Sequence, residues 1–245
     1  VGTLERALEP DAPQIWEGAR GNQGFHWHIG DAAAVADAFA RASHVAKLDL
    51  VNNRLVCNAM EPRSALAEYD AGRGEFTLWL SSQNPHVARI LLATATLRVP
   101  EHRIRVISPD VGGGFGSKAF HYNEDVIACY AARRTGRPVK WTAERSEAFL
   151  SDRHGRDHLT HVELALDGEG RFLGLRVSTV ANMGAYYSTF GPAIPTYYYA
   201  SLLSGTYRIP AIYCDVRGVF TNTVPVDAYR GAGPSKLIMQ AGGGS

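Results

Sequence analysis

The sequence predicts an α/β to α+β fold, with mixed sheets and helices on their faces. Residues 75–142 alternate strand-like and helix-like patterns, as a sheet with crossover helices requires. Residues 158–180 instead contain two alternating runs joined by a glycine turn, which is typical of an antiparallel hairpin. With 245 residues, 45% of them hydrophobic, the chain can bury a sizeable core.

The first elements are short. Residues 31–43 predict a helix, because their apolar positions share one helical face and Asp31 can cap the first turn. Residues 44–54 follow as an alternating strand. Glu61 and Pro62 predict a turn before a second extended segment.

The middle of the chain has the most regular pattern. It predicts a strand at 75–82, a helix at 85–97 with Pro85 near its first turn, a buried strand at 103–108, a glycine-rich loop, a helix at 123–134 and a strand at 139–142. Gly136 is the expected C-cap of the second helix.

The second half predicts mainly strands. Residues 158–166 and 171–180 form the hairpin around the turn at 167–170, and a last strand is expected at 213–221. Between them, residues 182–210 are rich in Gly, Pro and Tyr and scarcely charged. This stretch fits a surface loop over a site as well as it fits disorder, and its tyrosines fit a substrate pocket as well as core packing.

Composition excludes several classes of protein. Twenty-five basic and 24 acidic residues give a net charge of +1, which argues against nucleic acid or an anionic membrane as the main partner. No apolar run approaches the roughly 20 residues of a membrane span, and a cytoplasmic protein is expected. Three distant cysteines predict neither disulfides nor a metal site, so we expect them to be small buried hydrophobic residues.

The glycine-rich loop, VGGGFGSKAF at 111–120, can bring its backbone close to a bulky polar ligand. The loop alone is compatible with a phosphate, a dinucleotide or a pterin. A P-loop fails because Ser117 stands where the lysine is needed, and a dinucleotide fingerprint fails in both possible registers. We expect the backbone N–H groups of Gly114 to Gly116, at a strand-to-helix turn with a favourable helix dipole, to donate to anionic oxygens.

Four segments together resemble one family. They are SSQNPH at 81–86, PDVGGGFGSK at 109–118, TGRPVKW at 135–141 and AYRGAG at 228–233. In order and spacing they are similar to the molybdopterin-binding large subunit of the xanthine dehydrogenase, aldehyde oxidase and aerobic carbon monoxide dehydrogenase family.

The resemblance implies a cofactor, either molybdenum-molybdopterin or its cytosine dinucleotide form, in a full-length parent protein. It implies that Gln83 donates a hydrogen bond to a molybdenum oxygen ligand, and that Arg230 holds the pterin phosphate or pyrophosphate. It places Gly113, Gly114, Phe115 and Gly116 beside the cofactor. Taken alone, Gln83 could instead cap the helix that begins at Pro85, and Arg230 could be a surface cation.

Departures from the family pattern concern the substrate. Ala119 replaces a glutamate of the purine-oxidising members, Ala232 replaces an aromatic residue, and Tyr198 stands where an arginine is expected. Gly231 replaces the cysteine that bridges to copper in the carbon monoxide-oxidising members. The resemblance therefore implies a small-molecule substrate of the aldehyde or N-heterocycle type rather than a purine or carbon monoxide.

No catalytic residue is assigned, because Glu61, Glu124 and Glu144 do not match the general-base motif of the family, which would lie further along the parent chain. The implied function is that of a fragment of a molybdenum hydroxylase subunit. Such a subunit passes electrons to an iron-sulfur subunit or domain and an FAD subunit or domain. The alternative is a non-catalytic remnant or scaffold domain that keeps the fold.

Domain organisation is expected to follow the change of pattern after residue 142. The predicted parts are the tail of a preceding element at 1–30, a first lobe with the glycine loop at 31–150, a second lobe with the hairpin and aromatic loop at 151–235, and a linker-like tail outside the family at 236–245.

Overall fold

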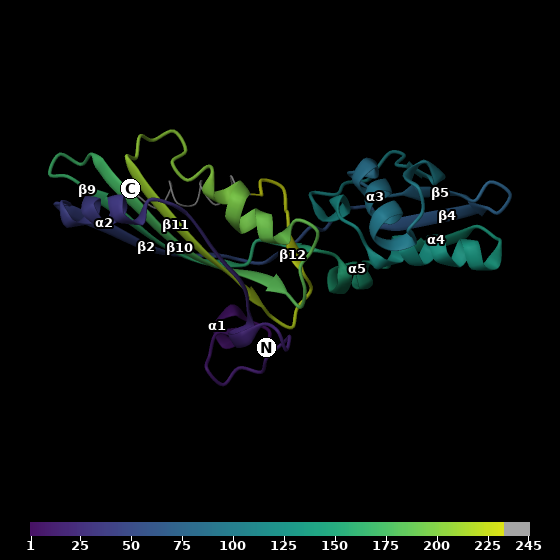
Figure 1. The fold of residues 1–245 in the computed structure, drawn as a ribbon, viewed down its shortest axis with the longest axis horizontal. Helices are drawn as coiled ribbons and strands as arrows, with labels where there is room; N and C mark the ends of the chain where they lie inside the picture. Colours follow the sequence, from purple (N-terminus) through teal and green to yellow (C-terminus); the bar gives the residue numbers. More distant parts are fainter. Residues whose placement is uncertain (233–245) are drawn as a thin grey trace. The chain divides into compact units, whose positions relative to one another are not determined.

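The computed structural model describes residues 1–232, which fall into two compact units (Figure 1). One unit is Val56–Asp152, and the other combines Val1–Leu55 with the chain from Arg153 onward. Each unit has its own sheet and core. The tail predicted at 236–245 lies outside the described residues.

The unit Val56–Asp152 contains a four-stranded mixed sheet in the order β6-β5-β4-β7. Its strands are β4 (Ser64–Asp70), β5 (Glu75–Leu80), β6 (Ile104–Ile107) and β7 (Val139–Thr142). Strand β4 pairs antiparallel with β5 and β7, whereas β5 and β6 are parallel. Helix α3 (Pro85–Leu91) lies within the crossover that this parallel pair requires. The mixed sheet expected from the sequence is confirmed.

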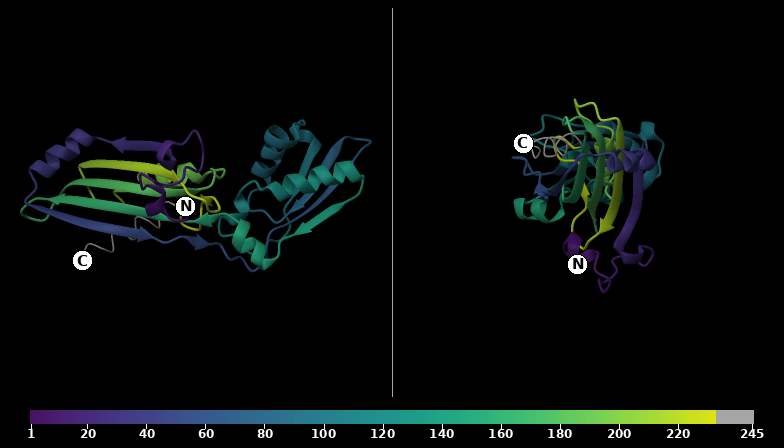
Figure 2. Two further views of the ribbon diagram at one scale, coloured as in Figure 1. Left: turned by 90° about the horizontal axis from the view of Figure 1, so that it is seen from below. Right: turned by 90° about the vertical axis from the view of Figure 1, so that its left-hand side faces the viewer.

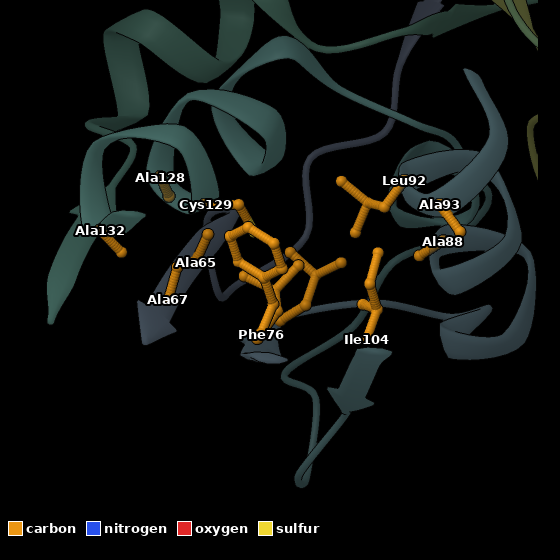
Figure 3. Close-up of a cluster of buried hydrophobic side chains, with 12 residues drawn as sticks. Ala65, Ala67, Phe76, Ala88, Leu92, Ala93, Ile104, Ala128, Cys129 and Ala132 are labelled. Carbon is orange, nitrogen blue, oxygen red and sulfur yellow. The ribbon is translucent and has the colours of Figure 1, made fainter. Parts of the chain in front are cut away.

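Helices α3 and α4 (Asn123–Thr135) pack on one face of this sheet (Figure 3). Side chains on that face of β4 and β5 alternate with more exposed ones, as a half-buried sheet requires. Small residues on both α4 and β4 allow close approach of the two backbones. The buried cluster contains Ala65, Ala67, Phe76, Leu78, Leu80, Ala88, Leu92, Ala93, Ile104, Ala128, Cys129 and Ala132.

The helix ends follow the expected signals, with one difference. Asn84 caps α3 by accepting from the Val87 N–H at 3.4 Å, and Gly136 ends α4 at φ 62°. The helix predicted at 85–97 keeps α geometry only to Leu91 and continues as a π-helical turn over Leu92–Leu97. Threonine hydroxyls in this turn bond back to backbone carbonyls, which competes with regular α geometry. A further helix, α5, covers Arg145–Ser151.

The other unit contains a five-stranded sheet in the order β1-β11-β10-β9-β2. Its strands are β1 (Gln23–Gly30), β2 (His44–Asn52), β9 (His158–Leu166), β10 (Phe172–Gly184) and β11 (Ala211–Phe220). Strands β9 and β10 form the predicted antiparallel hairpin, while β10 and β11 are parallel. Helix α1 covers Leu4–Ala7, and α2 (Ala32–Ala40), capped by Asp31 as expected, lies against β10 and β11 (Figure 2).

The segment 182–210 is ordered and contributes to the core. After the end of β10 it forms a 3-10 turn over Gly191–Ala193 and a π-helical turn over Ile194–Tyr198. Tyr199 is fully buried beside strand residues of β10 and β11, whereas Tyr197 and Tyr198 are exposed. Core packing is therefore the role of one tyrosine of the run, and the exposed ones are available to other molecules.

Two features differ from the sequence-based expectations. Residues 1–30 are predicted to be the tail of a preceding element, but they contain strand β1 of the five-stranded sheet. The alternation of Phe25, Trp27 and Ile29 with polar residues is the local signal of this strand. The elements α2 and β2, placed in a first lobe at 31–150, belong to the same compact unit as β9 and β10, because β2 pairs with β9 along its whole length. Long-range strand pairing of this kind leaves no local signal in the sequence.

Short strands complete the fold. They are β3 (Leu55–Val56), β8 (His154–Gly155) and β12 (Val226–Asp227), of which β8 and β12 pair in parallel. All three cysteines are buried, as predicted. Over residues 1–232, none of the helices has the length and apolar character to cross a bilayer, and no group of three metal-ligating side chains is placed to hold an ion.

Candidate functional site

The glycine-rich loop leaves β6 and reaches α4 through a 3-10 turn over Ser117–Ala119. Gly113 and Gly116 have φ values of 93° and 114°, a region that L-residues other than glycine rarely adopt. The expected position at the end of a strand is confirmed. The helix dipole, however, does not act on Gly114–Gly116 as expected, because α4 begins only at Asn123, beyond the 3-10 turn.

Gln83 fixes the second half of the loop. Its side-chain Oε1 accepts hydrogen bonds from the backbone N–H of Gly116 at 2.9 Å and of Lys118 at 3.3 Å. Its own backbone N–H donates to the Lys118 carbonyl at 2.9 Å. A side chain at position 114 would overlap the Gln83 amide, so the third glycine is required for this close approach.

These bonds determine the orientation of the Gln83 amide. Both backbone partners are donors, so Oε1 must face them and the Nε2 group must point elsewhere. Gln83 is exposed, and its Nε2 finds no acceptor within residues 1–232. The helix-capping alternative for Gln83 is wrong, because the neighbouring Asn84 is the N-cap of α3.

Glu61 fixes the first half of the loop in the same reciprocal way. Its Oε2 accepts from the Gly112 N–H at 2.8 Å, while its backbone N–H donates to the Gly112 carbonyl at 3.1 Å. The same oxygen accepts from the Ser81 hydroxyl at 2.8 Å and from Lys118 Nζ at 2.7 Å. We call Glu61, Gln83 and Lys118 the loop clamp.

The Glu61–Lys118 ion pair makes the loop clamp electrically neutral. The Lys118 side chain is only 1% exposed, so its ammonium group needs a charged partner. Partial burial disfavours the Glu61 carboxylate, but hydrogen bonds from Lys118, Gly112 and Ser81 outweigh this and lower its pKa. The lowered pKa makes the Glu61 carboxylate a weak base, and its Oε2 already accepts from Ser81, Gly112 and Lys118, so Glu61 is poorly suited to be a general base.

The loop presents uncharged donors. The backbone N–H groups of Gly114 and Phe115 bond to no acceptor in the described part of the chain, and Gln83 Nε2 adds a side-chain donor. The N–H of Gly116, which the sequence suggested as a donor to a ligand, is used by Gln83 instead. Such N–H groups can donate to oxygen atoms of a ligand without adding charge. A cofactor rich in oxygen therefore fits these residues.

Two more predicted residues lie on the loop. Phe115 is 41% exposed at φ 52°, and its ring lies next to Gly113, where an added Cβ would be 3.1 Å away. Ala119 ends the 3-10 turn and donates its N–H to the Gly116 carbonyl at 3.1 Å. Gln83, the glycines, Phe115 and Ala119 therefore belong to one unit and one loop system.

Arg63 contacts the glycine loop indirectly, through Tyr122. Its buried guanidinium bonds to Asp152 at 2.6 Å and to Glu124 at 3.1 Å and lies 3.6 Å from the centroid of the Tyr122 ring. Tyr122 in turn donates its hydroxyl to the Ser117 carbonyl at 2.7 Å. Burial raises the pKa of the neighbouring Asp125 to about 7, despite the opposing charge of Arg63.

The remaining predicted residues lie in the other unit. Arg230 is exposed after β12 and forms no ion pair with an acidic residue of the described chain. Tyr198 is 51% exposed and contacts Tyr197 edge to face, with ring centroids 6.3 Å apart. Ala232 is the last residue described. These three residues and the glycine loop belong to different compact units.

Glu61 and Lys118 are functional residues that sequence reasoning missed in this role. The sequence pattern places Glu61 at a turn and does not match it to the general-base motif, and it places Lys118 at the end of the glycine-rich family segment. A signal was present, because a lysine inside a loop that folds against the core must find a carboxylate. The sequence does not reveal which carboxylate, since the partner lies 57 positions earlier.

The chain is similar to several known proteins over most of its length. A family model described as molybdopterin cofactor-binding domain matches residues 15–241. The carbon monoxide dehydrogenase large chain of Hydrogenophaga pseudoflava is 38% identical over 234 residues, which is 89% of this chain and 29% of that protein. The nicotine 6-hydroxylase large subunit of Paenarthrobacter nicotinovorans is 34% identical over 201 residues, or 81% of this chain and 24% of that protein.

Solved structures show the same similarity. Quinoline 2-oxidoreductase from Pseudomonas putida 86 superposes with a TM-score of 0.86 at 33% identity, covering 95% of this chain and 29% of that one. A Cu,Mo-CO dehydrogenase superposes with a TM-score of 0.85 at 31% identity, covering 98% and 33%. The chain thus spans about a third or less of the length of these relatives.

Proposed function

Because the chain belongs to the family of molybdopterin cofactor-binding domains, we propose that it supplies part of the cofactor site in the large subunit of a molybdenum hydroxylase. The observation that carries the proposal is the clamped glycine loop. It offers the N–H groups of Gly114 and Phe115, and an amide of Gln83 whose orientation is fixed by two backbone bonds.

Each proposed residue has a separate role. When bound, the molybdenum-pterin group supplies transfer of oxygen from water to a substrate carbon and uptake of two electrons. Gln83 donates from Nε2 to an oxygen ligand, and residues 113–116 allow the backbone to come close. Arg230 binds the phosphate or pyrophosphate of molybdopterin or its cytosine dinucleotide form, for which a planar guanidinium is well suited.

We further propose that the substrate is an N-heterocycle or an aldehyde. Ala119 adds no charge near the loop, and the exposed Tyr198 offers an aromatic surface. Relatives with names such as nicotine 6-hydroxylase and quinoline 2-oxidoreductase support the first class. Carbon monoxide is disfavoured, because Gly231 provides no thiolate to bind copper. Electrons leave through iron-sulfur and FAD partners in the cytoplasm.

The proposal is tested with the full-length protein that contains this chain, purified from a host that makes the cofactor. We expect stoichiometric molybdenum by mass spectrometry and dye-coupled oxidation of quinoline, nicotinate or benzaldehyde, with little turnover of xanthine or carbon monoxide. Absence of molybdenum from the folded protein would favour the scaffold alternative. Rapid turnover of xanthine or carbon monoxide would instead contradict the substrate class while leaving the cofactor role intact.

A further inference from the structure

The segment that follows β8 contains a strained backbone. Arg156 and Asp157 are successive non-glycine residues with φ values of 69° and 65°. Side chains disfavour this left-handed region, and two such residues in a row persist only where the surroundings hold them. This segment contributes no residue to the proposed cofactor site.

A partly buried polar network holds Asp157 in this conformation. Its Oδ2 accepts from Arg54 Nε at 2.7 Å and from Asn182 Nδ2 at 2.9 Å. Its backbone N–H donates to the Asn52 carbonyl at 2.9 Å, and its carbonyl accepts from the Asn182 N–H at 3.0 Å. Asn182 is itself only 1% exposed. The strain is thus fixed by contacts to two strands of the long sheet.

The strained turn directs Arg156 toward the segment that carries Arg230. Arg156 Nη2 donates to the backbone carbonyl of Arg230 at 3.0 Å, and its guanidinium lies 5.2 Å from the centroid of the Tyr229 ring. A side chain at Gly155 would overlap Tyr229, so the two backbones are in close contact here. The parallel pairing of β8 with β12 sets the register of this contact.

We propose that Arg156 is a positioning residue for Arg230. It holds the Tyr229–Arg230 backbone in one place, so that the Arg230 side chain, which has no ion-pair partner of its own in residues 1–232, is directed toward a phosphate-bearing ligand. The strain at Arg156 and Asp157 is retained because an unstrained turn would point this guanidinium elsewhere. The proposal rests on the proposed role of Arg230 in binding the pterin phosphate.

The test uses the full-length protein and measures molybdenum and pterin bound per polypeptide, together with the thermal midpoint of unfolding. The variants are R156M, R230M, the double variant and R156K. R171M serves as the matched control, because the Arg171 side chain forms an exposed ion pair with Glu169 at the hairpin turn. We expect R156M to retain a folded protein and to lose bound cofactor about ten-fold, the effect of one hydrogen bond made by a charged group.

The double variant separates positioning from direct binding. If Arg156 acts through Arg230, R156M adds no further loss to R230M. Additive losses would overturn the proposal and make Arg156 an independent ligand contact. R156K should recover part of the cofactor, since lysine keeps one donor but not the planar stack on Tyr229. Should R156M unfold, R156K and the double variant R156K/R230M replace it: a loss in R156K that adds nothing to the loss in R230M supports the positioning role, and additive losses refute it.

Failure of the proposed function gives a different result. If R230M itself binds a normal amount of cofactor, then Arg230 does not hold the phosphate, and the site assignment is wrong. If R230M loses cofactor while R156M does not, only the positioning role of Arg156 is wrong.

Discussion

At the residue scale, Gln83 uses the two ends of its amide group differently. Oε1 holds the glycine loop through two backbone N–H groups, and this leaves Nε2 free to donate. The adjacent Asn84 performs the capping that Gln83 could have performed. Because Gln83 and Asn84 are neighbours with different roles, the loop support and the proposed ligand contact of Gln83 can be tested separately from helix capping.

We predict that Q83E in the full-length protein leaves the thermal midpoint close to that of the wild type and lowers turnover at least ten-fold. A carboxylate still accepts from Gly116 and Lys118, but it cannot donate and it adds a negative charge. The matched variant N84A should behave in the opposite way. It loses the N-cap, costs about 1 kcal/mol of stability and leaves turnover unchanged. Unchanged turnover in Q83E would exclude Gln83 from the reacting site.

At the scale of elements, the glycine loop is held by two earlier segments that contribute one acceptor side chain each. Glu61 bonds to the first half and Gln83 to the second, and Lys118 joins the two through its side chain and its backbone. A loop with four glycines would otherwise be flexible. Pre-organisation of this kind lowers the cost of holding a ligand.

We predict that E61Q destabilises the unit Val56–Asp152 by about 2 kcal/mol at neutral pH, because it leaves the buried Lys118 ammonium without a counter-charge. The double variant E61Q/K118M should recover part of that loss. The exposed pair Arg89–Glu101 provides the control, and E101Q should change stability by less than about 0.5 kcal/mol. Chemical denaturation of each variant measures these effects.

The same variant has a defined pH dependence. The pKa of Glu61 is lowered in the folded protein. The ionised carboxylate therefore stabilises the fold fully above the unfolded pKa near 4.5, and this stabilisation is lost as the pH falls through the folded pKa. The stability difference between wild type and E61Q should therefore shrink as the pH falls below about 4.5. A difference that grows on acidification would contradict the ion pair.

How far the sequence predicts these elements depends on where their determinants lie. Helices α2 and α4 were predicted well because cap residues and apolar periodicity are local, as at Asp31 and Gly136. The hairpin β9–β10 has a local glycine turn and was also predicted. Strand β1 pairs with β11, nearly 190 positions away, and the loop clamp joins residues 57 positions apart. Contacts between residues so far apart in the sequence leave no local pattern, so they become visible only in the folded structure.

At the scale of the whole chain, the unit that contains the five-stranded sheet is interrupted in sequence by the unit Val56–Asp152. Strand β2 must pair with β9, so the unit that contains them cannot form until the chain beyond Asp152 is available. The unit Val56–Asp152 is continuous and closes its own core from residues at most 67 positions apart. Shorter loops cost less entropy to close, which favours formation of this unit first.

The separate cores lead to a prediction about unfolding. Leu78 is fully buried in the core of Val56–Asp152, and Val177 is fully buried in that of the other unit. L78A should lower the free energy of unfolding by about 3 kcal/mol through lost burial and a cavity, and the smaller truncation V177A should lower it somewhat less.

Tryptophan fluorescence can measure the two units separately. The four tryptophans divide evenly, with Trp79 and Trp141 in one unit and Trp16 and Trp27 in the other. Fluorescence can therefore follow each unit once the other pair is replaced by phenylalanine. L78A should shift the denaturation midpoint reported by Trp79 and Trp141 and leave that reported by Trp16 and Trp27 in place, with the reverse for V177A. If each variant moved both midpoints equally, the chain would unfold as one cooperative body, and the glycine loop and the Arg230 segment would then lose their structure together.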